Sequence, residues 1–301
     1  MGYSLTKKSF GTSKRSCLFT IDTDMEISNF LYVRDFGYLF ICKKNHCIIF
    51  YGGNGFDFAW IGSPNQKGFR DGIRGSNYLD FPDSICYSEQ HNSFYLFESG
   101  GSRIRRIEAS DSNPAIMSIF GERDGKDFAR YFSKLKDKTL CESSCAIDGS
   151  SIYFSFTSLN KVVMIKDSQF SNFVGNGRSG FSTASNPSEC MLSRPSGIAI
   201  GNGDIYIADS GNSCIRKYCK NGLTVVAGYP LKSGDQDGKG IGCLLNHPSS
   251  LKVSDNIGYL IDGNKIKYMA LSDYSVGTVF ESDNMVAIDV DGRDLLILEK
   301  V

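Results

Sequence analysis

The sequence predicts an all-β fold, a six-bladed β-propeller made of four-stranded antiparallel blades. Three observations predict it. A unit of four short strands recurs about every 53 to 60 residues, glycine-rich turns separate the strands, and each end of the chain carries half a unit. Residues 1–301 are therefore expected to form a single domain.

The clearest unit runs from Leu192 to Gly228. Pro195 and Ser196 open a strand of small residues, GIAIG, and a Gly-Asn-Gly-Asp turn leads to the alternating strand DIYIAD. The strands CIRKYC and LTVVAG complete the unit after two further polar turns. Alternating apolar residues between tight turns are typical of antiparallel strands, so the unit is expected to form one twisted sheet.

The same pattern recurs at Leu79 to Ala109 and at Leu245 to Leu271, with weaker copies elsewhere. One apolar residue of each first strand serves to align the units: Leu31, Ile85, Cys145, Ile198, Leu251 and Ile288. The alignment predicts blades at about residues 24–62, 63–121, 122–175, 176–228, 229–280, and 281–301 joined with 1–23.

The last unit explains how the ring closes. Residues 285–301 contain only two strands, and Tyr3 to Phe10 with Cys17 to Ile21 can supply the other two. Because an isolated blade buries too little surface and exposes its edges, we expect strands from both termini to complete the last blade.

Composition narrows the functional classes. Lys+Arg and Asp+Glu each number 33, so no overall field attracts the chain to nucleic acid or anionic membranes. There is no secretory leader and no apolar run long enough for a membrane span, which predicts a soluble, cytoplasmic protein. The ten cysteines are expected to be mostly reduced thiols.

The repeat also resembles a known family. An apolar residue followed by P-x-G-I-A and then I-Y-I-A-D-x-x-N-x-x-I-R, best seen from Pro195 to Arg216, resembles the NHL repeat. The loops before the blades carry the family's Asp-Gly pair at Asp71-Gly72, Asp124-Gly125 and Asp237-Gly238. The resemblance covers the whole chain and is strongest in units two, four and five.

Several polar residues are predicted to have structural roles. Asp209 with Asn212, and Asp262 in the next unit, are expected to hydrogen-bond turn amides. The segment GDQDGKGIG, residues 234–242, superficially resembles a calcium loop but lacks the later Glu. We expect Asp237 to close a local turn there and Gly238 to supply a positive φ.

Catalysis is not expected, although the family includes enzymes. The resemblance to amidating lyases would imply a central metal held by histidines from different blades. The three histidines, His46, His91 and His247, map to non-equivalent positions of their units, and no matching set of inner Glu, Asn and Asp suggests a lactonase. No catalytic residue, metal ligand, cofactor or small-molecule substrate is therefore predicted.

The leading hypothesis is a non-catalytic protein-interaction scaffold, or a structural component of an assembly, that binds protein partners through rim loops. The alternatives are single-stranded RNA binding by a basic rim, which would weaken with salt, and a metal-dependent lyase or hydrolase at the axis. The candidate binding residues are those in predicted loops on one rim: Lys43, Lys44, Arg70, Arg74, Arg103, Lys161, Arg194 and His247.

Overall fold

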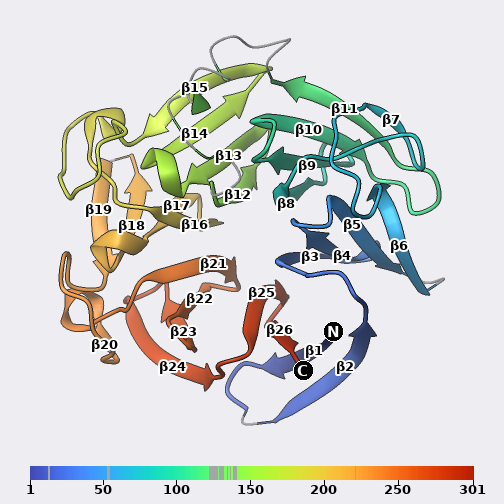
Figure 1. The fold of residues 1–301 in the computed structure, drawn as a ribbon. Helices are drawn as coiled ribbons and strands as arrows, with labels where there is room; N and C mark the ends of the chain where they lie inside the picture. Colours follow the sequence, from blue (N-terminus) through green and yellow to red (C-terminus); the bar gives the residue numbers. More distant parts are fainter. Residues whose placement is uncertain are drawn as a thin grey trace.

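The computed structural model describes residues 1–12, 14–52, 55–121, 141–220 and 222–301, together with residues 128, 132, 133, 135 and 137. Within these residues, six antiparallel sheets form a ring around a central axis (Figure 1). The predicted all-β, six-bladed propeller is confirmed.

The strands run from the axis outward in chain order in five blades. Blade 1 comprises β3 (Asn29–Val33), β4 (Gly37–Cys42), β5 (Cys47–Gly52) and β6 (Gly55–Gly62). Blade 2 comprises β8 (Pro82–Ser88), β9 (Ser93–Glu98), β10 (Arg103–Glu108) and β11 (Ala115–Phe120). Blade 3 comprises β12 (Ser143–Asp148), β13 (Ser151–Phe156), β14 (Lys161–Lys166) and β15 (Gln169–Val174).

Blade 4 comprises β16 (Pro195–Gly201), β17 (Asp204–Asp209), β18 (Cys214–Cys219) and β19 (Gly222–Ala227). Blade 5 comprises β21 (Pro248–Ser254), β22 (Ile257–Asp262), β23 (Lys265–Ala270) and β24 (Ser275–Glu281). Short 3-10 turns occur at Thr157–Leu159, Pro187–Glu189, Ser210–Asn212 and Gly240–Gly242.

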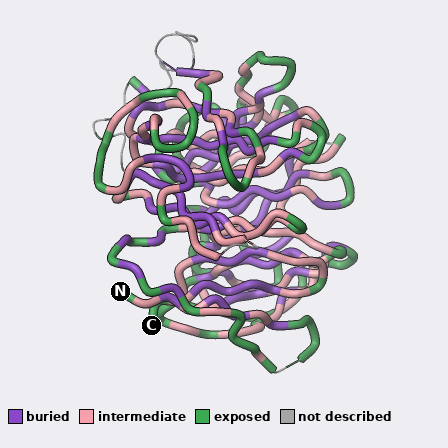
Figure 2. The backbone as a smooth tube through the Cα atoms, turned by 90° about the vertical axis from the view of Figure 1, so that its right-hand side faces the viewer, coloured by how far each residue is buried: buried purple, intermediate pink, exposed green. Residues whose placement is uncertain are grey.

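Blade 6 joins the two ends of the chain, as predicted. Its order from the axis is β25 (Met285–Asp291), β26 (Asp294–Lys300), β1 (Gly2–Ser9) and β2 (Arg15–Asp22). Leu5 of β1 pairs with Leu298 of β26, and the Val301 amide donates to the Gly2 carbonyl at 2.9 Å. The termini therefore lie side by side (Figure 2), and the ring has no open edge between them.

The core is divided among the interfaces between neighbouring blades. Each of the six interfaces has its own cluster of buried apolar side chains. Between blades 1 and 2, for example, the buried Trp60 donates its indole N–H to the Ser110 carbonyl at 2.9 Å. The apolar faces of each sheet are thus covered mainly by the neighbouring blades, which is why a single blade could not be stable.

The alignment of the units needs one correction. All six marker residues lie on innermost strands, and Ile85 packs against the preceding blade, as a first-strand marker should. Leu31, however, packs against the following blade, and its neighbour Phe30 occupies the equivalent position. Since Phe30, Leu31 and Tyr32 are all apolar or aromatic, alternation could not reveal this one-residue offset.

Two connecting loops add a fifth strand to the outer edge of a blade. In blade 2, β7 (Gly72–Ile73) pairs with β11, and in blade 5, β20 (Gly238–Lys239) pairs with β24 (Figure 1). Both strands begin at an Asp-Gly pair of the repeat. The third pair, Asp124-Gly125, lies outside the described residues.

The two ends of the ring differ. At one end the chain enters each first strand and turns between the second and third strands; we call this end the connection face. At the other end lie the turns between first and second strands and between third and fourth strands; we call it the hairpin face.

Candidate functional site

Buried cations on the third strands hold the connecting loops in place. Arg105 of β10, Arg216 of β18 and Lys267 of β23 occupy the third position of their strands, and their side chains are fully buried. Each contacts groups on the loop that precedes its own blade. We call such a buried cation, with the acidic and carbonyl groups that it binds, a loop clasp.

The blade 2 clasp contains the buried residues Glu98 and Arg105. Arg105 Nη1 lies 2.7 Å from Glu98 Oε2, and its Nη2 lies 2.8 Å from Asp71 Oδ1 on the connecting loop. Burial raises the pKa of Glu98, and the attraction of Arg105 opposes that rise. Arg105 thus links the connecting loop, through Asp71, to the sheet, and its removal would leave the buried Glu98 without its ion-pair partner.

The blade 4 clasp is built from the strongest repeat motif. Asp209 accepts hydrogen bonds from the Ser193 amide and from Asn212 Nδ2, each at 2.7 Å. Arg216 lies 3.7 Å from the Asp209 carboxylate and donates to the carbonyls of Ser182 and Met191. Burial raises the Asp209 pKa to about 6, although these hydrogen bonds favour its charged form.

The blade 5 clasp uses lysine and two loop carboxylates. Lys267 Nζ lies 2.8 Å from Asp235 Oδ1 and 2.8 Å from Asp237 Oδ1. Asp237 also accepts the Thr278 amide at 2.8 Å. The carboxylates of the segment that resembled a calcium loop therefore bind the ammonium group of Lys267. This ammonium group occupies the position that a metal ion would have in a calcium loop.

This clasp overturns two expectations for the loop. Asp237 does not close a local turn, because its partners Lys267 and Thr278 lie 30 and 41 residues further along the chain. Gly238 is not a positive-φ residue, since it pairs as an extended strand with Val276; Gly240, at φ 58°, is the residue that turns the chain. The local motif could not show that the loop folds onto the next blade.

Asp262, the last residue of β22 in blade 5, occupies the position equivalent to Asp209 in blade 4. Its Oδ1 accepts the Asn246 amide at 2.6 Å, while its buried Oδ2 has no hydrogen-bond partner among the described residues. Burial raises the pKa of Asp262 to about 6. The acid thus supports the entrance of β21, without the direct ion pair seen in blade 4.

An exposed apolar patch lies on the loop between blades 4 and 5. It consists of Tyr229, Leu231 and Ile241, whose exposed fractions are 52%, 70% and 58%. The Gly228 amide donates to the Gly240 carbonyl at 3.2 Å, which brings Tyr229 close to Ile241 in space, and the Leu231 amide donates to the Asn212 carbonyl at 2.9 Å. We call these three residues the loop patch. The sequence signal for it was weak, because apolar residues in a loop have no periodicity.

Two predicted rim residues stand at the entrances of the innermost strands of blades 4 and 5, the two blades that the patch-bearing loop joins. Arg194 and His247 are exposed, with positive φ angles of 51° and 62°, and each directly precedes the proline that begins an innermost strand. Asn246, next to His247, accepts a hydrogen bond from Ser233 of the patch-bearing loop at 3.0 Å. Such φ values are uncommon for residues with side chains, so the surrounding loop structure imposes this backbone conformation on both residues.

The other rim candidates are more dispersed, and several have acidic partners. Lys43 lies 2.5 Å from Asp83, and Lys44 lies 2.9 Å from Glu26. Lys161 begins β14, and burial lowers its pKa.

Blade 2 holds three more candidates. Arg103 stacks 3.9 Å from the ring of Phe69. Arg70 is exposed, and Arg74 lies on the part of the loop that turns over the outer edge of the blade, 2.8 Å from Asp57. Arg74 is therefore not on the connection face. The predicted RNA-binding rim stays a prediction, and its basic residues do not form one unpaired cluster.

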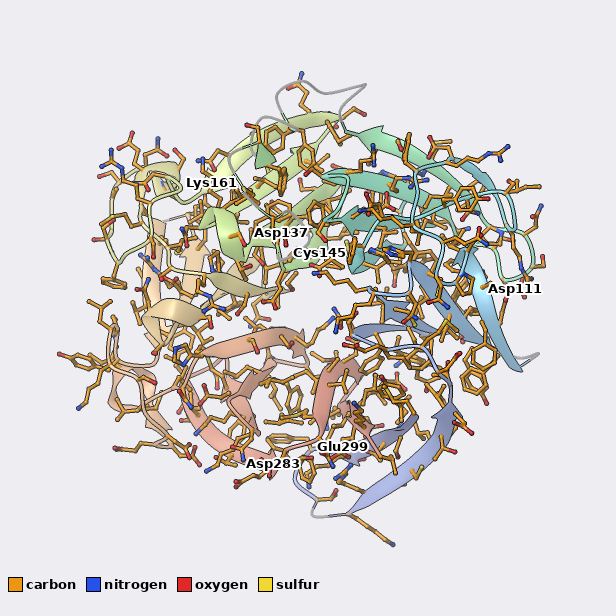
Figure 3. The ribbon with its side chains drawn as sticks, in the orientation of Figure 1. Asp111, Asp137, Cys145, Lys161, Asp283 and Glu299 are labelled. Carbon is orange, nitrogen blue, oxygen red and sulfur yellow. The ribbon has the colours of Figure 1, made fainter. Side chains whose placement is uncertain are left out.

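The axis is lined by polar and thiol groups from several blades. Lys252 lies 3.4 Å from Asp289, whose carboxylate also accepts the Tyr32 amide at 2.7 Å. Cys145 lies near the centre of the ring (Figure 3), where its thiol interacts with that of Cys86. All ten cysteines are unbridged.

The histidines are separated as the sequence indicated. His46 lies in the turn between β4 and β5, and its Nδ1 accepts the Phe81 amide at 3.2 Å. His91 lies at the opposite end of the ring, in the turn between β8 and β9. In the described part of the chain, no three His, Cys, Asp or Glu side chains gather as a metal-binding group.

The fold and the loop clasps define the class: an all-β, six-bladed propeller with repeat motifs that tie its loops to its sheets. The chain is a six-bladed β-propeller that carries an NHL repeat, since residues 192–218 match the family model for the NHL repeat. That segment contains Ser193, Asp209, Asn212 and Arg216, which belong to the blade 4 clasp.

A relative among characterised proteins is Protein SUPPRESSOR OF QUENCHING 1, chloroplastic, from Arabidopsis thaliana. It is 28% identical over 227 residues, which cover 69% of this chain and 21% of the relative. The chain thus spans about a fifth of that relative's length. No helix among the described residues is long and apolar enough to cross a membrane. The relative's chloroplastic description does not fit a purely cytoplasmic expectation.

Solved structures share the fold at low identity. An auxiliary nutrient binding protein from Bacteroides ovatus has a TM-score of 0.59 and 11% identity, with 95% of this chain and 62% of that chain covered. A catalytically inactive virginiamycin B lyase from Staphylococcus aureus, solved with quinupristin, has a TM-score of 0.58 and 12% identity, with 99% and 100% covered. At these identities the likeness concerns the fold alone.

Proposed function

We propose that this propeller is a protein-interaction scaffold that binds a partner through the loop patch, Tyr229, Leu231 and Ile241. The observation that carries the proposal is that these apolar side chains are exposed on a loop that the buried Lys267 binds through Asp235 and Asp237. Burying exposed apolar side chains in a complex is favourable, because it removes them from water. A loop that is already held in place loses little conformational entropy when it binds.

The surroundings of the patch indicate the chemistry of the partner. Arg194 and His247 lie on the neighbouring entrances of β16 and β21 and are exposed. A partner with an apolar anchor and an acidic group beside it would match this arrangement, because aromatic and arginine residues commonly dominate binding energy at such interfaces.

The experiment is an affinity purification of the tagged chain from its native source, in parallel with two variants. Leu231→Glu with Ile241→Glu places charges in the loop patch, and Met117→Glu places one on an exposed apolar residue of blade 2. A stoichiometric protein partner that is lost only from the patch variant supports the proposal. A partner retained by the patch variant, or lost equally from both, contradicts it.

Thermal unfolding of both variants separates loss of binding from loss of folding. The three substituted side chains are exposed, so the melting temperatures should stay within a few degrees of the unsubstituted chain. Nucleic acid and metal in the same eluate should be measured as well. A partner-free ring with one equivalent of metal would favour an axial enzyme instead.

A further inference from the structure

A pocket between blades 2 and 3 has the features of a ligand site and is separate from the loop patch. Its volume is about 350 Å³. It opens on the hairpin face, because its rim comes from the β8–β9, β12–β13 and β14–β15 turns. The lining residues used below are His91, Tyr95, Arg106, Ile152, Ile165 and Asp167.

Arg106 is held in the pocket wall without an acidic partner. Its Nε donates to Ser93 Oγ at 2.9 Å, and its Nη2 donates to the His91 carbonyl at 3.4 Å. No carboxylate of the described residues lies within ion-pair distance of it, whereas the adjacent Arg105 contacts two. The guanidinium is therefore oriented by neutral groups, and its Nη1 donors are left for a ligand.

A second donor is fixed beside the arginine. His91 Nδ1 and the Tyr95 hydroxyl are 2.9 Å apart. Burial raises the pKa of Tyr95, so its hydroxyl keeps its proton and can donate it to Nδ1. With the phenol as donor, the imidazole carries a hydrogen on Nε2, which is available to an acceptor in the pocket.

The remaining walls limit the size and charge of a ligand. Ile152 and Ile165 are buried apolar side chains that a hydrocarbon or aromatic group can contact. Asp167 lies at the rim, in a tight turn where it and Ser168 have φ angles of 50° and 58°. Its carboxylate would repel a doubly charged anion more strongly than a singly charged one.

We propose that this pocket binds a small organic carboxylate with an apolar body, the carboxylate on Arg106 and His91 and the body on the isoleucines. A guanidinium pairs well with a carboxylate because its two parallel N–H groups match the two oxygens. The carboxylate could come from a free small molecule or from the C-terminus of a peptide, and the two sources share this chemistry.

The direct test is calorimetric titration of the full chain with phenylacetate, with phenylacetamide as the uncharged control of the same shape. Phenylacetate should bind at least tenfold more tightly than the amide and more tightly than inorganic phosphate. Equal binding of acid and amide, tighter binding of phosphate, or no binding at millimolar concentrations would overturn the proposal.

Variants locate the site. Arg106→Gln should weaken phenylacetate binding at least tenfold, whereas Arg293→Gln, which changes an exposed arginine in the β25–β26 turn on the same face, should leave it unchanged. Asp167→Asn should strengthen phosphate binding. If Arg106→Gln does not fold, Arg106→Lys replaces it in the titration. This variant keeps the positive charge but lacks the two parallel N–H groups of the guanidinium. Unchanged affinity in the folded Arg106 variant contradicts the assignment.

A short peptide ending in phenylalanine, with a free or an amidated C-terminus, distinguishes the sources. Tighter binding of the free-acid peptide than of phenylacetate identifies a chain terminus as the natural ligand. Exclusion of the peptide, with phenylacetate still bound, identifies a free small molecule. Peptide binding that does not depend on the free carboxylate counts against the proposal.

Discussion

Lys267 Nζ lies 2.8 Å from Asp237 Oδ1, although the two residues are 30 positions apart. The lysine belongs to the third strand of blade 5 and the aspartate to the loop that reaches blade 5 from blade 4. This ion pair fixes the path of the loop that carries Tyr229, Leu231 and Ile241. The buried ammonium group of Lys267 therefore helps to position the loop that carries the exposed loop patch.

Lys267→Met should loosen the loop without unfolding the ring. The substitution removes hydrogen bonds to two carboxylates, which are themselves partly exposed, and should lower the free energy of unfolding by about 1.5–3 kcal/mol. Hydrogen exchange should quicken in residues 229–241 more than in the innermost strands. Lys232→Met, on the same loop but exposed, is the control; equal exchange in both variants would count against the clasp.

Asp209→Asn should cost more stability than Asp262→Asn. Both Asp209 oxygens face donors, the Ser193 amide on one side and Asn212 Nδ2 with the Arg216 guanidinium on the other, so the NH2 group of an asparagine would meet a donor and cost about 1–3 kcal/mol. Asp262 has no ion-pair partner among the described residues, and an asparagine oxygen at this position can still accept the Asn246 N–H. Urea unfolding of both variants measures the difference, and the reverse order would contradict the assigned roles.

The raised pKa of Asp262 gives a pH prediction with a definite sign. Its pKa is about 6 in the folded chain and near 3.8 when unfolded, so the folded state binds the proton more tightly. Its stabilising contribution is full below pH 3.8 and is lost as the pH rises through about 6.

The measurement compares the unsubstituted chain with Asp262→Asn, which cannot titrate, from pH 4 to 7. As the pH rises, the unsubstituted chain should lose stability relative to the variant. Asp283→Asn, on the exposed loop before β25, should show no such trend. A constant difference across this range would mean that Asp262 is not protonated near pH 6.

The contact between the termini predicts tolerance to circular permutation. Because Val301 and Gly2 are hydrogen-bonded neighbours, a short linker can join the ends without strain. New termini between Asn202 and Gly203, in the β16–β17 turn, break no strand. The permuted chain should retain its β circular dichroism and cooperative melting.

Deletion of residues 2–9 provides the contrasting result. It removes β1, exposes the edge of β26 and takes the buried Tyr3 and Leu5 out of the core. This variant should be unfolded or strongly destabilised. A stable deletion variant would show that closure of blade 6 contributes little to the ring.

The sequence by itself determined the ring. The number of blades, their four strands and the closure by both termini follow from local alternation, tight turns and a repeated unit that cannot bury its faces alone. The motif around Asp209 and Asn212 was also visible, because its residues lie close together in the chain. The one-residue offset at Phe30 and Leu31 escaped, since both residues are apolar, and so did the fifth strands β7 and β20, which pair with distant parts of the chain.

The tertiary structure decided which residues are available for function. Arg105 and Lys267 are charged, yet both are buried, because loops from more than 25 residues earlier fold over them. Leu231 is apolar and exposed, and Arg106 lies in a pocket between two blades with no carboxylate of the described residues within ion-pair distance. Exposure and pairing depend on neighbours that are distant in sequence, which a local pattern of residues does not specify.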